Sequence, residues 1–217
     1  MSVLTADYLD AIERLPEGAT LVIQKLSWDD YERLLKDLRG RPHLRISYDR
    51  GKLEVMSPLP EHEEYARFID DLVRVFAHAH QLKVQKYGAA TWKRQRLDRG
   101  VEPDCCYYVA NALRVIGKRK FDLEIDPPPD IIVEIDITNE SWSKFPIYAA
   151  LSVPEIWWYD SKNIRFYELA RDEYGEVFES RFFPGLTPAL LLAALEQSKS
   201  DGQDAALDSF REHWTSK

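Results

Sequence analysis

The sequence predicts an α/β fold in which helices flank a mixed β-sheet. Segments with apolar residues at every third or fourth position are interspersed with segments that have them at every second position. The chain has 217 residues, 45% of them hydrophobic and 30% charged, which is typical of a soluble globular protein. We expect one domain over residues 1–217, with a core at about 44–169, N-terminal helices within 1–40 and a helical tail at 186–217.

The first part of the chain predicts two helices and a hairpin. Thr5 to Leu15 and Ser27 to Leu38 have the apolar spacing of helices, and Ser27 is a residue type favoured as an N-cap. Residues 44–48 and 52–56 alternate at every second position, and the intervening Asp49-Arg50-Gly51 is typical of a turn. These two segments are therefore expected to pair as a β-hairpin.

The strongest helical pattern starts after Pro60 and ends near Gln81. Its apolar stripe consists of Tyr65, Phe68, Ile69, Leu72, Val73, Phe76 and His80. Further strands are expected at Val84–Ala90, Thr91–Arg96, Asp104–Val109, Asp130–Ile137, Glu155–Tyr159 and Ile164–Leu169. A helix is expected at Ser141–Leu151, where Pro146 fits only the first turn. Two more helices are expected in the tail, at Pro188–Gln197 and Ala205–His213, separated by residues 198–202.

The net charge excludes one class of function. A value of −8 argues against a protein that coats nucleic acid through an extended basic surface. The charge is uneven, however, because residues 83–120 contain ten basic and three acidic residues, a net charge of +7. This basic segment is either one positive surface for a polyanion or a solvated face with scattered cations.

The chain is expected in the cytoplasm. No apolar run reaches the roughly 18 residues needed to cross a bilayer, and the first residues do not resemble a secretory signal. The two cysteines, Cys105 and Cys106, are adjacent, and neighbouring residues of a strand point to opposite faces. A disulfide between them is therefore not expected, in keeping with a reducing compartment.

Acidic residues stand where the strand pattern predicts apolar ones. Glu134 and Asp136 are two positions apart in the strand expected at 130–137, so both side chains lie on one face. Neighbouring buried carboxylates repel each other, and burying even one without a partner is costly. A bound cation, a basic side chain or solvent at the strand end is therefore expected beside them.

A further acid and a lysine add to this pattern. Asp104 follows Pro103 at the start of a strand, and Lys144 lies at the start of the helix after Asp136. A lysine is unfavourable at a helix N-terminus, which is already positive, so nearby carboxylates explain its position better. Carboxylates with a nearby lysine suit Mg²⁺ or Mn²⁺, and such an ion lowers the pKa of a bound water molecule. The lysine can stabilise the charge on a phosphate, so the set fits phosphodiester hydrolysis. Structural salt bridging is the alternative for each of these residues.

The order of Pro103-Asp104 and Glu134-Ile135-Asp136 resembles the active-site signature of the PD-(D/E)XK nuclease superfamily. More closely, the chain resembles a bacterial family of "putative restriction endonucleases" over about residues 44–169. The similar stretches are residues 49–58 with His62, then 101–104, 129–134, 144–148 and 153–157. The resemblance implies a restriction-endonuclease-like fold, with Asp104 and Glu134 as metal ligands.

The chain departs from the superfamily pattern at one position. The superfamily usually has a lysine two residues after its second acid, where this chain has Asp136. The resemblance implies that Lys144 has taken over this role from the following helix. His62 opens a helix at a place where the superfamily often has a polar active-site residue. The alternative is that His62 is a packed core residue. In that case the adjacent Glu63 could fill the active-site role instead. Glu54 is expected to be exposed.

We therefore expect a DNA endonuclease that depends on Mg²⁺ or Mn²⁺. The candidate metal ligands are Asp104, Glu134 and Asp136, and the further catalytic candidates are Lys144 and His62. DNA would enter along the basic segment, and because cutting both strands of a duplex needs two sites, a homodimer is expected. Two alternatives stay open: an inactive DNA- or protein-binding module of the same fold, and a two-carboxylate glycosidase that needs no metal.

Overall fold

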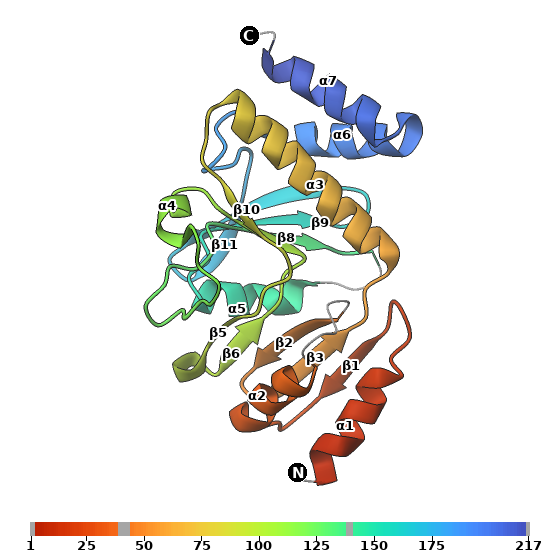
Figure 1. Ribbon diagram of the computed structural model, residues 1–217, viewed down its shortest axis with the longest axis vertical. Helices are drawn as coiled ribbons and strands as arrows, with labels where there is room; N and C mark the ends of the chain where they lie inside the picture. The colour runs from red at the N-terminus through yellow and green to blue at the C-terminus, as the bar shows by residue number, and fades with distance from the viewer. Residues whose placement is uncertain (1–2, 39–43, 138–140, 216–217) are drawn as a thin grey trace.

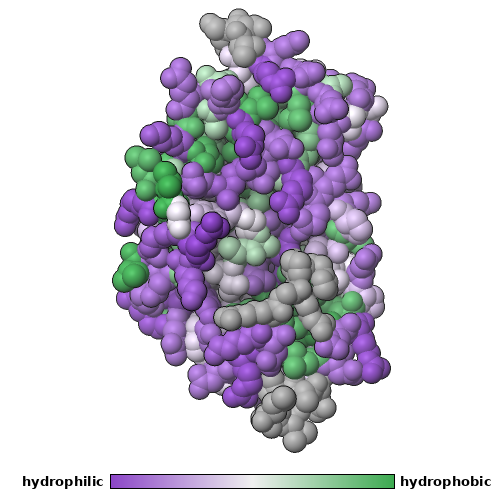
Figure 2. Space-filling view, in the orientation of Figure 1, coloured by the Kyte–Doolittle hydropathy of each residue, from purple (hydrophilic) through white to green (hydrophobic). Residues whose placement is uncertain are grey.

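The computed structural model describes residues 3–38, 44–137 and 141–215. Two β-sheets lie one above the other along the long axis, each with helices packed against it (Figure 1). In the view of Figure 2, hydrophilic residues cover most of the surface and apolar residues form separate patches. Among the described residues, no helix is both long and apolar enough to cross a membrane.

The N-terminal sheet has five strands, and every neighbouring pair in it is antiparallel. Its strand order is β1-β3-β2-β6-β5. The strands are β1 (Thr20–Ile23), β2 (Arg45–Asp49), β3 (Lys52–Met56), β5 (Trp92–Arg94) and β6 (Arg99–Val101). Helices α1 (Val3–Glu13) and α2 (Trp28–Asp37) share an apolar core with one face of this sheet, which includes Ile46, Tyr48, Leu53 and Val55.

A two-residue turn fixes the register of the hairpin between β2 and β3. Arg50 and Gly51 have positive φ values of 47° and 92°, and Asp49 pairs with Lys52. Positive φ at both central positions is the geometry that matches the twist of two paired strands. The turn therefore sends Ile46 and Tyr48 toward α2 and leaves Arg45 on the opposite face of the sheet.

The second sheet has six strands and is mixed. Its order is β11-β10-β9-β8-β7-β4. The strands are β4 (Gln85–Tyr87), β7 (Cys105–Tyr108), β8 (Ile131–Ile135), β9 (Glu155–Tyr159), β10 (Ile164–Ala170) and β11 (Glu173–Val177). Only the β8–β9 pair is parallel, because α5 (Phe145–Ala150), preceded by a 3₁₀ turn at Ser141–Lys144, carries the chain back between these two strands.

Helices cover both faces of the six-stranded sheet. The long helix α3 (Pro60–Ala79) crosses one face together with α6 (Pro188–Asp201) and α7 (Gln203–Thr215), and this layer contains the largest apolar core (Figure 1). The opposite face packs on α5 and on the short helix α4 (Ala112–Val115). Cys105 and Cys106 lie in these two different cores and are both free thiols, as the alternation of a strand predicts.

The structure confirms the predicted mixed sheet with flanking helices and adds an antiparallel sheet. The sequence pattern did not predict β1, β6, β11 or α4, because elements of three to five residues hold too few positions to show a period. The expected break at residues 198–202 is shorter than predicted, since α6 continues through Asp201 and α7 begins at Gln203. The chain turns at Gly202, whose φ is 90°, a value that suits glycine.

Replacing Leu72 by alanine tests the packing of α3. This side chain is fully buried in the core between α3 and the sheet. Because the substitution leaves a cavity there, it is expected to lower the free energy of unfolding by about 2–5 kcal/mol. Urea denaturation followed by circular dichroism measures this. The neighbouring exposed residue offers a control: Asp71→Ala is expected to change the value by less than about 0.5 kcal/mol.

Candidate active site

Asp104 and Glu134 meet at the ends of two neighbouring strands. Cys105 pairs with Val133 and Cys106 with Ile132, so the same register places Asp104 opposite Glu134. The backbone N–H of Ile135 donates a 2.8 Å hydrogen bond to Oδ2 of Asp104. Only 5% of Asp104 and none of Glu134 is exposed to solvent. The structure thus brings these two acids together on the sheet face that packs against α5.

The helix after β8 supplies two partners for Glu134. Lys144, at the N-cap of α5, donates a 2.6 Å hydrogen bond from Nζ to Oε2 of Glu134. The hydroxyl of Tyr148 donates to the other oxygen, Oε1. Lys144 and Tyr148 are four positions apart, which places them on the same side of one helical turn. Both oxygens of this buried carboxylate are therefore held by one short helix.

Arg45 connects Asp104 to the other sheet. It comes from β2, is only 3% exposed, and donates from Nε to Oδ1 of Asp104 at 3.1 Å. Its Nη2 donates to Glu63, which lies in the first turn of α3 and is about half exposed. One guanidinium thus holds Asp104, Glu63 and two sheets in a fixed arrangement, and its planar set of donors suits this role.

Asp136 and Glu134 share one sheet face, as their spacing predicts. Glu134 pairs with Trp158 of β9, and Nε1 of Trp158 donates a 2.6 Å hydrogen bond to Oδ2 of Asp136. Asp136 is 8% exposed and lies at the end of β8. The structure therefore extends the row of buried acids by one residue toward the segment that follows the strand.

His62 approaches the acids from α3. It is only 1% exposed, and neither ring nitrogen has a hydrogen-bond partner in the described part of the chain. Burial lowers the pKa of the imidazole, while the charges of Asp104 and Asp136 act in the opposite direction. A buried ring with two unsatisfied nitrogens beside carboxylates is unusual in a folded protein and indicates a partner that arrives from outside the chain.

Burial governs the protonation of Glu134. Burial in the protein interior raises the pKa of this carboxyl to about 7, although the Lys144 ammonium opposes the shift. For Lys144 burial alone would lower the pKa, but Glu134 and Asp104 together raise it. The pKa values of both groups are therefore raised, for different reasons. Several acids favour the charged form of Lys144, whereas the negative charge of Asp104 disfavours the charged form of Glu134.

The acids of this cluster are the type of ligand that a hard divalent cation takes, but within the described residues they are not gathered into a metal site. In residues 3–38, 44–137 and 141–215, no three His, Cys, Asp or Glu side chains are gathered tightly enough to hold a metal ion as they stand. Asp104 is hydrogen-bonded to Arg45 and Glu134 to Lys144, and the ring of His62, whose nitrogens have no partner among the described residues, interacts with the charges of Asp104 and Asp136. Carboxylate oxygens suit Mg²⁺ or Mn²⁺, whereas an imidazole ligand suits Zn²⁺, Cu²⁺, Fe²⁺ or Ni²⁺.

Sequence reasoning missed two residues of this cluster and misplaced a third. Arg45 could have been recognised as a charged residue inside a strand with alternating apolar positions. Tyr148 could have been recognised because it lies four positions after Lys144, on the same side of the expected helix. Glu54 was expected to be exposed, but its side chain is only 21% exposed, pairs with Lys52 and accepts a 3.3 Å hydrogen bond from Ser143. Glu54 thus lies on the face of β3 that contacts the segment before α5.

A mixed sheet with acids on neighbouring strands and a lysine from the following helix defines a protein of the restriction-endonuclease-like class. The chain belongs to the Uma2 family, described as "Putative restriction endonuclease", whose model matches residues 28–198.

A crystal structure of a "putative nuclease" from Anabaena variabilis is similar to this chain, with a TM-score of 0.46 and 16% sequence identity. The similarity covers 68% of this chain and 89% of that one. No curated protein matches the sequence significantly.

The raised pKa of Glu134 predicts how stability varies with pH in metal-free buffer. The folded protein keeps this proton up to about pH 7, whereas the unfolded chain releases it near 4.5. Because the folded state binds more protons in this window, the contribution of Glu134 to stability falls as the pH rises from 4.5 to 7. Urea denaturation with a chelator should show a shallower fall for Glu134→Gln. Parallel curves for the two proteins would contradict the assignment.

Removing Arg45 should leave Asp104 buried without its counterion. We expect Arg45→Met to lower the free energy of unfolding by about 3–5 kcal/mol, as for other broken buried ion pairs. Arg67→Met is the matched control, because its side chain is 70% exposed and pairs with Glu63 at 3.5 Å. That control should change stability by no more than about 0.5 kcal/mol in the same urea titration.

Proposed function

We propose that this protein is a metal-dependent endonuclease that hydrolyses phosphodiester bonds of DNA. The observation that carries this proposal is the buried pair Asp104 and Glu134, with Lys144 hydrogen-bonded to Glu134 at 2.6 Å. Such a set has little value as packing, since buried charges contribute less to stability than apolar residues of similar volume. Membership of a family described as restriction endonucleases supports the same reading.

Asp104 and Glu134 would hold the metal ion, with Asp136 as a further ligand or an orienting residue. When bound, Mg²⁺ or Mn²⁺ would offset charge on a phosphate and lower the pKa of a coordinated water. Lys144 would turn its ammonium from Glu134 toward the phosphate, where it stabilises the added negative charge. His62 would take up the proton of the attacking water at a ring nitrogen, because burial favours its neutral form.

DNA would reach this site along the basic segment at residues 83–120. Five of its ten cations, Lys86, Lys93, Arg96, Arg99 and Lys118, pair with acids of the chain itself. The free positive surface is therefore smaller than the sequence count indicates, and binding would be weak until the metal adds its charge. Two copies of the chain would be needed to cut both strands of a duplex at one position.

One observation favours the rival function, a module of the same fold that binds without cleaving. All four oxygens of Asp104 and Glu134 already accept hydrogen bonds from Arg45, Ile135, Lys144 and Tyr148. A metal ion would have to share or displace these donors. The rival predicts that DNA or a protein binds at this surface in the presence of a chelator.

Cleavage of supercoiled plasmid in Mg²⁺ or Mn²⁺ tests the proposal. Asp104→Asn and Glu134→Gln are each expected to lower the rate by about 100-fold or more, because each removes a charge that holds the metal. Lys144→Met should lower the rate by a similar factor while Mn²⁺ binding, measured by calorimetry, remains. Gel electrophoresis of the plasmid gives the rate.

The control variant is Glu176→Gln, which removes an exposed acid from β11, at the far edge of the six-stranded sheet. Its rate should equal that of the wild type. Wild-type protein that neither binds Mn²⁺ nor cleaves DNA or RNA would overturn the proposal. Retention of DNA by the same protein in the presence of a chelator would favour the rival.

A further inference from the structure

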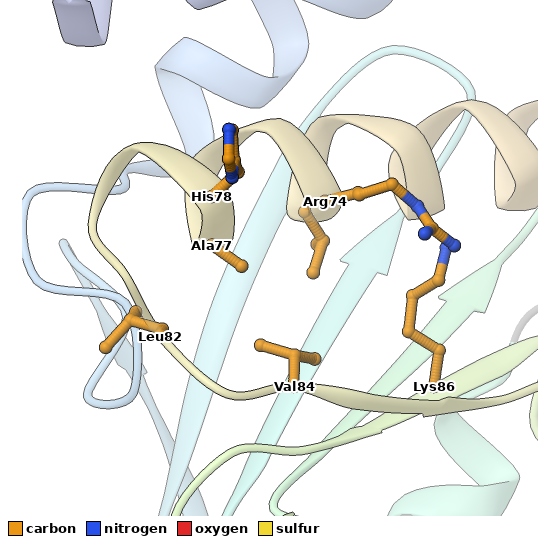
Figure 3. A pocket seen from close by; sticks show the side chains of 7 residues that line it. Arg74, Ala77, His78, Leu82, Val84 and Lys86 are labelled. Carbon is orange, nitrogen blue, oxygen red and sulfur yellow. The ribbon is translucent and has the colours of Figure 1, made fainter.

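A hollow of about 400 Å³ lies between the C-terminal half of α3 and the segment that forms β4 (Figure 3). This volume falls in the range of pockets that bind small molecules. None of the residues that line it belongs to the cluster of acids around Glu134. The hollow is on the α3 side of the six-stranded sheet, whereas Asp104 and Glu134 face α5, so the two places are separate.

Apolar side chains from two elements form the inner part of the hollow. Val73 and Ala77 are buried on α3 and stand one helical turn apart. Leu82 and Val84 lie on the approach to β4 and project to the same side, because they alternate along an extended chain. β4 is the last strand of its sheet, which leaves this space beside α3 open. An apolar body could therefore enter it from the surface.

The rim of the hollow is cationic. Arg74, His78 and Lys86 line it, and Figure 3 shows the Arg74 side chain extending along the helix toward Lys86. Lys86 is neutralised by Asp70, whose Oδ2 lies 3.2 Å from Nζ. The side chains of Arg74 and His78 have no hydrogen bond or ion pair within the part of the chain that the structure describes.

This distribution of charge is unexpected in a protein with a net charge of −8. Arg74 and His78 are four positions apart on one helix, so both side chains lie on the same side of it. An arginine without a local partner beside an apolar hollow gains most from an anion that sits in that hollow. Its planar guanidinium offers two parallel donors, which match the two oxygens of a carboxylate.

We propose that this hollow is a binding site for a small organic monocarboxylate with an aliphatic body. Arg74 would bind the carboxylate, His78 would add a ring donor, and Val73, Ala77 and Val84 would cover the aliphatic part. With Lys86 already paired and histidine counted as neutral, one positive charge is left uncompensated. That balance favours a carboxylate over the doubly charged phosphate of a nucleotide. The proposal is independent of the nuclease function.

Titration calorimetry of the full chain with sodium octanoate tests the site. We expect saturable binding that weakens by about tenfold or more in Arg74→Gln, which removes the charge, and in Val84→Trp, which fills the hollow. Acetate lacks the aliphatic body and octanamide lacks the charge, so each should bind at least about tenfold more weakly. Amide shifts in ¹H–¹⁵N spectra should be centred on residues 73–86.

Arg211→Gln is the matched control, because it removes another arginine, one that pairs with Asp208 on α7. Its affinity for octanoate should equal that of the wild type. Three results would overturn the proposal: no saturable binding of octanoate, equal affinity in Arg74→Gln and the wild type, or tighter binding of thymidine monophosphate or inorganic phosphate than of octanoate. Because no metal or DNA is present, failure here leaves the nuclease test unaffected.

Discussion

The burial of acidic side chains at the ends of β7 and β8 is the constraint on which the rest of this structure depends. Asp104 and Glu134 lie opposite each other on neighbouring strands and are almost completely shielded from water. Two adjacent carboxylates in that setting are unfavourable without compensation. Arg45 and Lys144 provide it, and each comes from a different part of the chain.

The ion pair between Arg45 and Asp104 connects the two sheets. Arg45 belongs to the five-stranded sheet, while the acid that it binds belongs to the six-stranded sheet. The same arginine also contacts Glu63 at the start of α3, so one side chain ties a strand, a strand end and a helix together. The five-stranded sheet thus contributes a residue to the site.

The two faces of the six-stranded sheet have different chemistry. The face under α5 combines an apolar core with the row of acids, whereas the core under α3, α6 and α7 is largely apolar and contains the buried Glu155, which accepts a hydrogen bond from Trp157. The cationic hollow beside α3 belongs to that second side, at the edge strand β4. A sheet that ends in a three-residue strand leaves space next to its covering helix, and this is where a second ligand site can exist without disturbing the first.

Sequence alone determined the features that rest on local pattern: the long helix α3, the hairpin with its turn at Arg50 and Gly51, and the shared face of Glu134 and Asp136. These follow from periods of 3.6 and 2, which need only neighbouring residues. The tertiary structure decided that Arg45 reaches Asp104 and that Tyr148 joins Lys144 on Glu134. It also decided that the buried ring of His62 has no hydrogen-bond partner among the described residues. Such contacts depend on register between distant strands and on burial, which raises the pKa of Glu134 and which no local pattern encodes.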